Sequence, residues 1–225
     1  MYVERSSAKG VGFWAAVLTS ALSLAYVAGQ LAEWTGLLGS GGGPDNPSTA
    51  FGLAVLLTPS FLLGPAFLTM IIALNCAAPS HRRVYTHCAV AFAVMYVTLN
   101  CSIYFVQLTF VAPRLTRGDL EDIHLLLFLP YRSFMFAIDL LGYTWMSAST
   151  LFAAFGLPIS RVSNATRIAL VANGLLIPAL ALQMYYPWLI WVGSLWAVTF
   201  PAAAILTARL FAIMPPTAGG SHPVA

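Results

Sequence analysis

Residues 134–157, FMFAIDLLGYTWMSASTLFAAFGL, decide how this chain folds. The stretch is long enough to cross the hydrocarbon core of a bilayer as a helix, which takes about 20 residues. One acidic residue, Asp139, lies near its beginning. An ionised carboxylate inside a membrane helix costs roughly 2.5–3.5 kcal/mol or more. We therefore expect Asp139 to have a partner or a function.

The whole chain has the composition of an integral membrane protein. Of its 225 residues, 60% are hydrophobic and 8% are charged, whereas about a quarter of the residues of soluble proteins are charged. Further stretches without Asp, Glu, Lys or Arg cover residues 10–32, 46–81, 84–113, 140–160 and 168–208. The last can hold two spans, because Tyr185, Tyr186 and Pro187 near its middle favour a turn at the headgroup level.

These stretches predict one all-α domain, a polytopic transmembrane helix bundle of six spans. We place the spans at about residues 11–32, 51–75, 87–112, 134–157, 167–184 and 187–211. The second span contains Pro59, Gly64 and Pro65, so we expect it to kink.

The basic residues predict the orientation of the bundle, since cytoplasmic loops carry an excess of Lys and Arg. With a cytoplasmic amino terminus, most basic residues fall inside: Arg5, Lys9, Arg82, Arg83, Arg161, Arg167 and Arg209. Arg114, Arg117 and Arg132 fall outside. We therefore predict that both termini are cytoplasmic. The formal net charge of +3 reflects this topology and does not indicate nucleic-acid binding.

The second outer connection has a helical pattern of its own. Its apolar residues Leu120, Ile123, Leu126 and Leu127 repeat with a helical period, and acidic residues stand near its start. We expect a short interfacial helix within residues 114–131 that ends before Pro130. It either shields the edge of the bundle or covers an outward opening.

Three predicted spans carry a stripe of polar residues on one face. At 100° per residue, the stripe of the third span lies within an arc of about 80°, that of the fourth within about 40° and that of the first within about 60°. Their members are Tyr96, Asn100, Tyr104 and Gln107; Arg132, Asp139, Tyr143 and Thr150; and Thr19, Tyr26, Gln30 and Glu33.

Several of these side chains share a depth in the outer half of the bilayer. At about 1.5 Å per residue, Asp139 and Gln107 lie roughly 8 Å below the outer ends of their spans, and Tyr26 lies roughly 9 Å below. We therefore predict an outward-opening polar pocket between the first, third and fourth spans. Its predicted ligand-binding residues are Asp139, Tyr143, Asn100, Tyr104, Gln107, Tyr26, Gln30 and Arg132.

Two states of Asp139 fit this pattern. It is either ionised and paired with Arg132, or neutral and hydrogen-bonded to Gln107 or a tyrosine. In the purely structural alternative, the stripes form interhelical hydrogen bonds, worth about 0.6 kcal/mol each.

Chemical motifs are scarce. Asp119, Glu121, Asp122 and His124 stand in one outer segment with no second histidine cluster, so we predict no metal site. We recognise no catalytic or cofactor motif, which leaves open whether the protein is an enzyme.

The stretches YFVQLT at 104–109 and DLLGY at 139–143, separated by the amphipathic outer segment, resemble uncharacterised multi-pass membrane proteins of bacteria. This resemblance implies a six-helix protein of the bacterial inner membrane and brings no activity or residue roles.

We hypothesise that the pocket binds a small amphipathic or lipid-like molecule, as a receptor or a transporter. Two alternatives remain: an intramembrane enzyme that uses Asp139 as acid or base, and a structural subunit of a homo-oligomer or larger membrane complex. The expected partners are membrane lipids and the small ligand, with no nucleic acid.

Overall fold

The apolar stretches fold as helices because a membrane offers no water to backbone N–H and C=O groups. The computed structural model describes residues 2–119 and 121–214, which contain helices and no strands. Four long helices are continuous: α1 (Tyr2–Trp34), α2 (Ala50–Ala77), α3 (Arg83–Val106) and α5 (Phe134–Gly156). A 3₁₀ turn, η1 (Ser80–Arg82), joins α2 to α3.

The last two passes are each divided. The fifth consists of α6 (Arg161–Gly174) and α7 (Ile177–Ala181), and the sixth of η4 (Pro187–Leu189), α8 (Ile190–Gly193) and α9 (Trp196–Ile213). The turn expected at Tyr185 to Pro187 separates them.

Hydroxyl side chains fix where several helices begin. Thr49, Ser133 and Ser160 stand immediately before α2, α5 and α6, and each accepts a hydrogen bond from a backbone N–H of the first turn. Such caps satisfy donors that have no partner within the helix.

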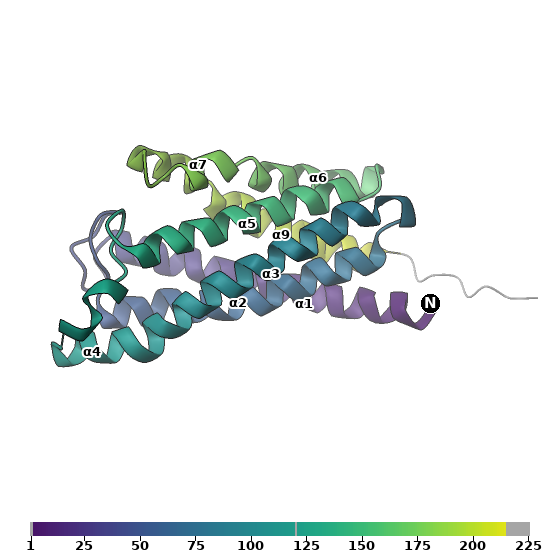
Figure 1. Cartoon of the computed structure of the whole chain (residues 1–225). Helices are drawn as coiled ribbons and strands as arrows, with labels where there is room; N and C mark the ends of the chain where they lie inside the picture. The colour runs from purple at the N-terminus through teal and green to yellow at the C-terminus, as the bar shows by residue number, and fades with distance from the viewer. Residues whose placement is uncertain (1, 120, 215–225) are drawn as a thin grey trace, which may run out of the picture.

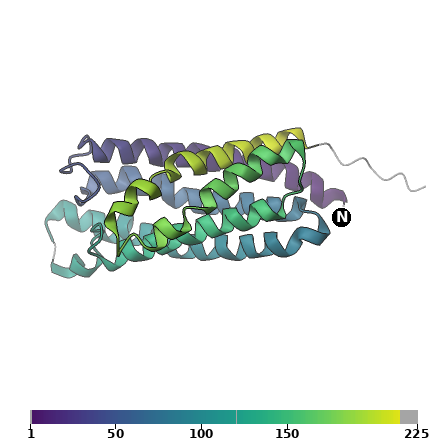
Figure 2. The ribbon, with the colours of Figure 1, turned by 90° about the horizontal axis from the view of Figure 1, so that it is seen from above.

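The six passes form a closed ring. Each packs against the next in chain order, α1 with α2, α2 with α3, α3 with α5, α5 with α6 and α6 with α9, and α9 closes the ring against α1 (Figures 1 and 2). Successive passes run in opposite directions, so the connections gather at two ends. The end that carries residues 35–49, 112–133 and 182–189 is called the loop end. The other is called the opposite end.

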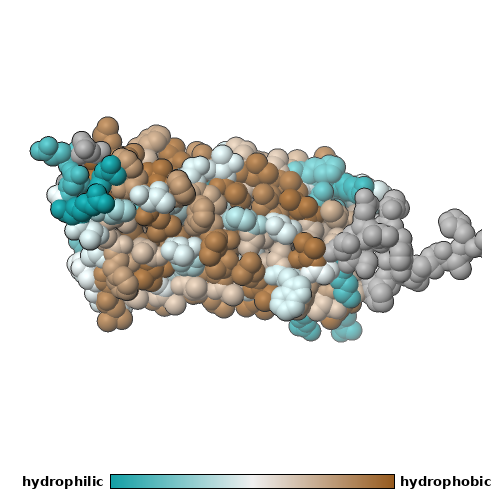
Figure 3. Space-filling model, turned by 90° about the horizontal axis from the view of Figure 1, so that it is seen from below, coloured by the Kyte–Doolittle hydropathy of each residue, from teal (hydrophilic) through white to brown (hydrophobic). Residues whose placement is uncertain are grey.

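Five helical segments are long and apolar enough to cross a membrane: Ala8–Trp34, Ala50–Ala77, Ser80–Arg117, Arg161–Ala181 and Pro187–Ile213. The remaining pass, α5, carries more polar side chains, and Ser147, Ser149 and Thr150 are fully buried inside the bundle. In Figure 3, hydrophobic side chains cover the middle of the molecule and hydrophilic ones gather toward its ends. The all-α multi-pass membrane bundle is thus confirmed, while the cytoplasmic placement of the termini stays a prediction.

The predicted interfacial helix takes the form of two short pieces. The first piece is α4 (Ala112–Arg117), which a π-helix, η2 (Gln107–Val111), connects to α3. Helix α4 is capped by Gly118 in the left-handed conformation. The second piece is the 3₁₀ helix η3 (Glu121–Leu126). Leu120, part of the predicted apolar period, lies outside the described residues. Whether this segment lies in the membrane interface stays a prediction.

Helix α2 runs without a break through both of its prolines. Pro65 has no N–H to donate to the Phe61 carbonyl, and the Cys101 thiol of α3 lies 3.5 Å from that oxygen as a replacement donor. Gly64 lets Cys101 approach, because a Cβ at this position would meet its sulfur at 2.5 Å. The neighbouring helix thus satisfies the group that the proline frees, and the breaks occur instead in the last two passes.

Candidate functional site

A cavity of about 350 Å³ lies inside the ring at the loop end. Leucines form much of its wall, among them Leu53 and Leu56 of α2, Leu140 of α5 and Leu180 of α7. The α1–α2 connection contributes Pro44 and Ser48, and the segment before α5 contributes Phe128 and Pro130. Pockets that hold small molecules in other proteins also have walls that are mainly apolar.

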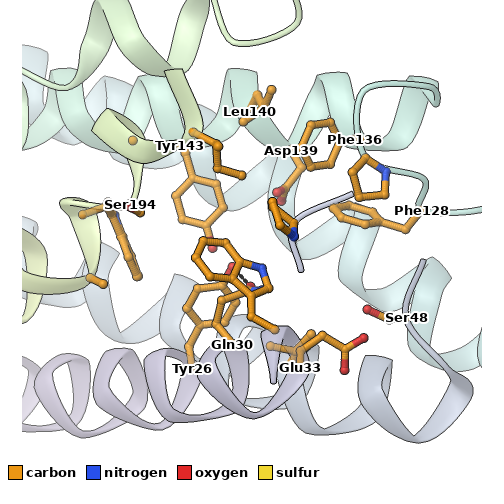
Figure 4. Close-up of a pocket in the computed structure, with 18 of the residues that line it drawn as sticks. Tyr26, Gln30, Glu33, Ser48, Phe128, Phe136, Asp139, Leu140, Tyr143 and Ser194 are labelled. Atoms are coloured by element: carbon orange, nitrogen blue, oxygen red, sulfur yellow. Dashed lines mark hydrogen bonds between the residues drawn. The ribbon is translucent and has the colours of Figure 1, made fainter. Parts of the chain in front are cut away.

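Asp139 enters the cavity from the first turns of α5 (Figure 4). It is 7% exposed, and two side chains of α3 donate hydrogen bonds to its Oδ1: Asn100 Nδ2 at 2.9 Å and Tyr104 Oη at 2.7 Å. Both donors meet the same oxygen, so Oδ2 has no donor among the described residues. This second oxygen is the one available to the cavity.

The close approach of α3 and α5 makes this arrangement possible. Gly142 stands one turn after Asp139, and a Cβ there would overlap the amide oxygen of Asn100. The glycine therefore leaves room for Asn100 to reach Asp139. The Tyr143 hydroxyl lies 3.2 Å from that of Tyr104 and extends the polar group along the cavity wall.

A second set of polar side chains lines the cavity from α1. The Tyr26 hydroxyl donates to Gln30 Oε1 at 3.0 Å. The Trp196 ring of α9 meets the rings of Tyr26 and Tyr143 edge-on, at centroid distances of 5.6 and 5.4 Å. Trp196 therefore joins the two polar sets and closes the cavity toward the opposite end.

Glu33, in the last turn of α1, also lines the cavity. It is 3% exposed, and neither carboxylate oxygen has a hydrogen-bond partner within the described part of the chain. Its carboxylate lies over Gly52 at the beginning of α2, where a Cβ would meet Oε2 at 2.7 Å. The sequence places Glu33 in the stripe of α1, but that stripe alone gave no reason to rank it as a ligand-binding residue.

The structure brings five of the eight predicted binding residues to the cavity wall: Asp139, Tyr143, Tyr104, Tyr26 and Gln30. Asn100 contacts Asp139 and does not line the cavity itself. That any of these residues binds a ligand stays a prediction.

Gln107 and Arg132 lie elsewhere. Gln107 is fully buried in η2 and donates from Nε2 to the Leu126 carbonyl at 2.7 Å, which ties the π-helix to η3. Arg132 is exposed and does not line the cavity. Asp139 is therefore bonded to a tyrosine, Tyr104, which was one of the expected partners, and to Asn100, whereas Arg132 and Gln107 do not contact it through a hydrogen bond. The seven-residue offset put Arg132 on the correct face, but α5 begins only at Phe134 and so does not extend to it.

Of the last two passes, the sequence pointed only to Gln183, near the outer end of the fifth span, as a residue that could join the polar layer. Leu180, Gln183 and Ser194 line the cavity where these passes are interrupted, and Trp196 begins α9. Interrupted membrane helices often form binding sites, because their ends expose backbone polar groups. Pro178, Pro187 and Gly193 are the sequence features near these interruptions.

The described residues contain no group of three or more His, Cys, Asp or Glu side chains that could hold a metal ion. Comparison of the chain with protein-family models, with curated proteins and with solved structures finds no match.

Proposed function

We propose that the protein binds a small amphipathic or lipid-like molecule in the loop-end cavity, as a membrane receptor or transporter. One observation carries the proposal: a largely apolar cavity of about 350 Å³ into which Asp139 presents one unpaired carboxylate oxygen. An apolar wall with a few fixed polar groups suits a ligand that has one polar end. From the sequence resemblance, we further propose that the membrane is the inner membrane of a bacterium.

The residues beneath the cavity favour binding over an open passage. The ring of Trp196 stacks on that of Phe200 with a centroid distance of 4.9 Å. The rings of Phe200 and Phe67 lie 5.5 Å apart between centroids. These three aromatic side chains fill the interior of the bundle between the cavity and the opposite end. Transport would require them to move, whereas binding from the loop end would not.

Mass spectrometry of co-purifying molecules tests the proposal. The full chain is extracted gently, and bound lipids and metabolites are compared between the wild type, Asp139→Asn and Ala197→Phe. Ala197 lines the cavity, so a phenylalanine there fills space without removing a polar group. We expect a species that is present in the wild type and lost from both variants.

Asn173→Leu is the matched control, because Asn173 is a buried polar residue of α6 outside the cavity. It should retain the bound species. Equal occupancy in the wild type and in both cavity variants would contradict the proposal and favour a packing role for Asp139. Circular dichroism and gel filtration establish that each variant is folded.

A further inference from the structure

We infer that the ligand carries a substituted ammonium group that binds beside Glu33 at the loop end of the cavity. This inference rests on the proposed function and specifies the chemistry of the ligand.

Among acidic and basic side chains of the described residues, only acids line the cavity. Glu33 and Asp139 line it, and no Lys, Arg or His of the described residues does so. A buried carboxylate without a counter-charge is costly, because removal from water is not repaid by an ion pair. A cationic ligand supplies the missing counter-charge.

The two acids differ in what already surrounds them. Asp139 accepts hydrogen bonds from Asn100 and Tyr104, so donors of the protein offset part of its desolvation cost. Glu33 has no such donor within the described residues, although it is 3% exposed. Of the two acids, Glu33 is therefore the one whose carboxylate most lacks hydrogen-bond donors.

The beginning of α2 offsets only part of the Glu33 charge. The carboxylate lies over Gly52, in the first turn of α2. The amino end of a helix acts as roughly half a positive charge. The Gly52 N–H itself donates to the Thr49 side chain, 3.0 Å away. Glu33 is left with charge that a ligand can neutralise.

The surroundings suit an organic cation better than a metal ion. Calcium takes about 6–8 oxygen ligands, and no acidic cluster of that kind is present among the described residues. Aromatic rings line the cavity, including Trp34, Tyr26, Phe128 and Phe136. Aromatic faces attract alkylammonium groups, which also tolerate the loss of water. The leucines of α2 then provide the wall for an apolar tail.

Paired probes test the charge of the head group. The full chain is reconstituted in nanodiscs of a neutral glycolipid that has no ammonium group. Binding of octyltrimethylammonium is measured against its uncharged isostere, in which carbon replaces nitrogen. We expect the cation to bind at least about 10-fold more tightly than the isostere. Empty nanodiscs and Ala197→Phe correct for partition into lipid.

Variants of Glu33 locate the head group. Glu33→Gln removes the charge at nearly constant shape and should weaken binding of the cation about 30-fold or more, as expected when one member of a buried charge pair is lost. Its affinity for the isostere should hardly change. Glu33→Asp keeps the charge and should keep part of the preference for the cation, which provides a second variant if Glu33→Gln does not fold.

The outcomes separate this inference from the proposed function. Equal binding of both probes, unaffected by Glu33→Gln, overturns the ammonium inference while cavity binding stands. A loss of thermal stability in Glu33→Gln without a change in probe preference means that Glu33 stabilises the beginning of α2, and this result also overturns the ammonium inference. If neither probe binds the wild type better than Ala197→Phe, and no molecule co-purifies, the proposed function itself fails.

A second lipid composition distinguishes the source of the ammonium group. When phosphatidylcholine replaces the glycolipid, its choline head group competes with the probe if a membrane lipid is the ligand. A fall in probe affinity indicates a lipid, and an unchanged affinity indicates a free amphiphile. Both results support an ammonium site.

Discussion

The loop end and the opposite end of the bundle both bury polar side chains, but they satisfy them differently. Toward the opposite end, Asn173 donates to Thr150 Oγ1 at 3.0 Å and accepts from Thr199 Oγ1 at 3.1 Å. Both the nitrogen and the oxygen of its amide are therefore hydrogen-bonded, and they join α6 to α5 and α9. The Thr86 hydroxyl of α3 donates a hydrogen bond to Asn75 Oδ1 of α2 at 2.7 Å.

At the loop end, strong acceptors are left over. Buried oxygens without a partner in the described chain include both of Glu33, Oδ1 of Asn100 and Oε1 of Gln107. Elsewhere in the described bundle the unpaired buried groups are hydroxyls, those of Thr19, Tyr96 and Ser147. Since an unpaired buried group is costly, the difference indicates that polar residues at the opposite end serve packing, while at the loop end Glu33, which lines the cavity, keeps two acceptors without a partner in the described chain.

The strongest test of this comparison disrupts the α3–α5 contact. In Gly142→Ala the new Cβ would overlap the Asn100 amide, and overpacking of a close contact typically costs about 1–3 kcal/mol. We expect a loss of about 2–3 kcal/mol in the free energy of unfolding, measured by SDS titration of the protein in mixed micelles. Gly10→Ala is the control, because a Cβ at Gly10 meets nothing within 4 Å. A Gly142→Ala variant as stable as the wild type would mean that the helices separate without cost.

A smaller effect is expected from Asn173→Leu, which separates stability from binding. It removes two interhelical hydrogen bonds, each worth about 0.6 kcal/mol in membrane proteins. We therefore expect a loss of about 1 kcal/mol in the same titration, with the affinity for octyltrimethylammonium within about 2-fold of wild type. A large loss of affinity would contradict the assignment of this residue to packing.

The sequence predicted the bundle well because the membrane makes the signal simple. Long apolar runs, prolines and a lone acid were enough to predict the passes and to single out Asp139, which is buried and hydrogen-bonded inside the bundle. The same periodicity placed Tyr26, Tyr104 and Tyr143 on faces that meet the cavity.

What the sequence could not provide was the order of helices around the ring and the exact ends of α5. Helical phase says which residues share a face but not which helix that face meets, so the contributions of α2 and α9 were missed. Gln107 has the expected phase, yet it binds the Leu126 carbonyl of a segment whose path no periodicity describes.

The smallest predicted effect concerns Tyr26, and it sharpens the assignment of the cation to Glu33. Tyr26→Phe removes the hydroxyl that donates to Gln30 but keeps the ring that meets Trp196 edge-on. We expect the free energy of unfolding to fall by about 0.5 kcal/mol. The affinity for octyltrimethylammonium should fall only about 2-fold, because an aromatic face attracts a cation without its hydroxyl. If Tyr26→Phe weakened this probe as strongly as Glu33→Gln, the head group would lie at the Tyr26–Gln30 pair, nearly two turns deeper along α1, and the unpaired Glu33 would need another explanation.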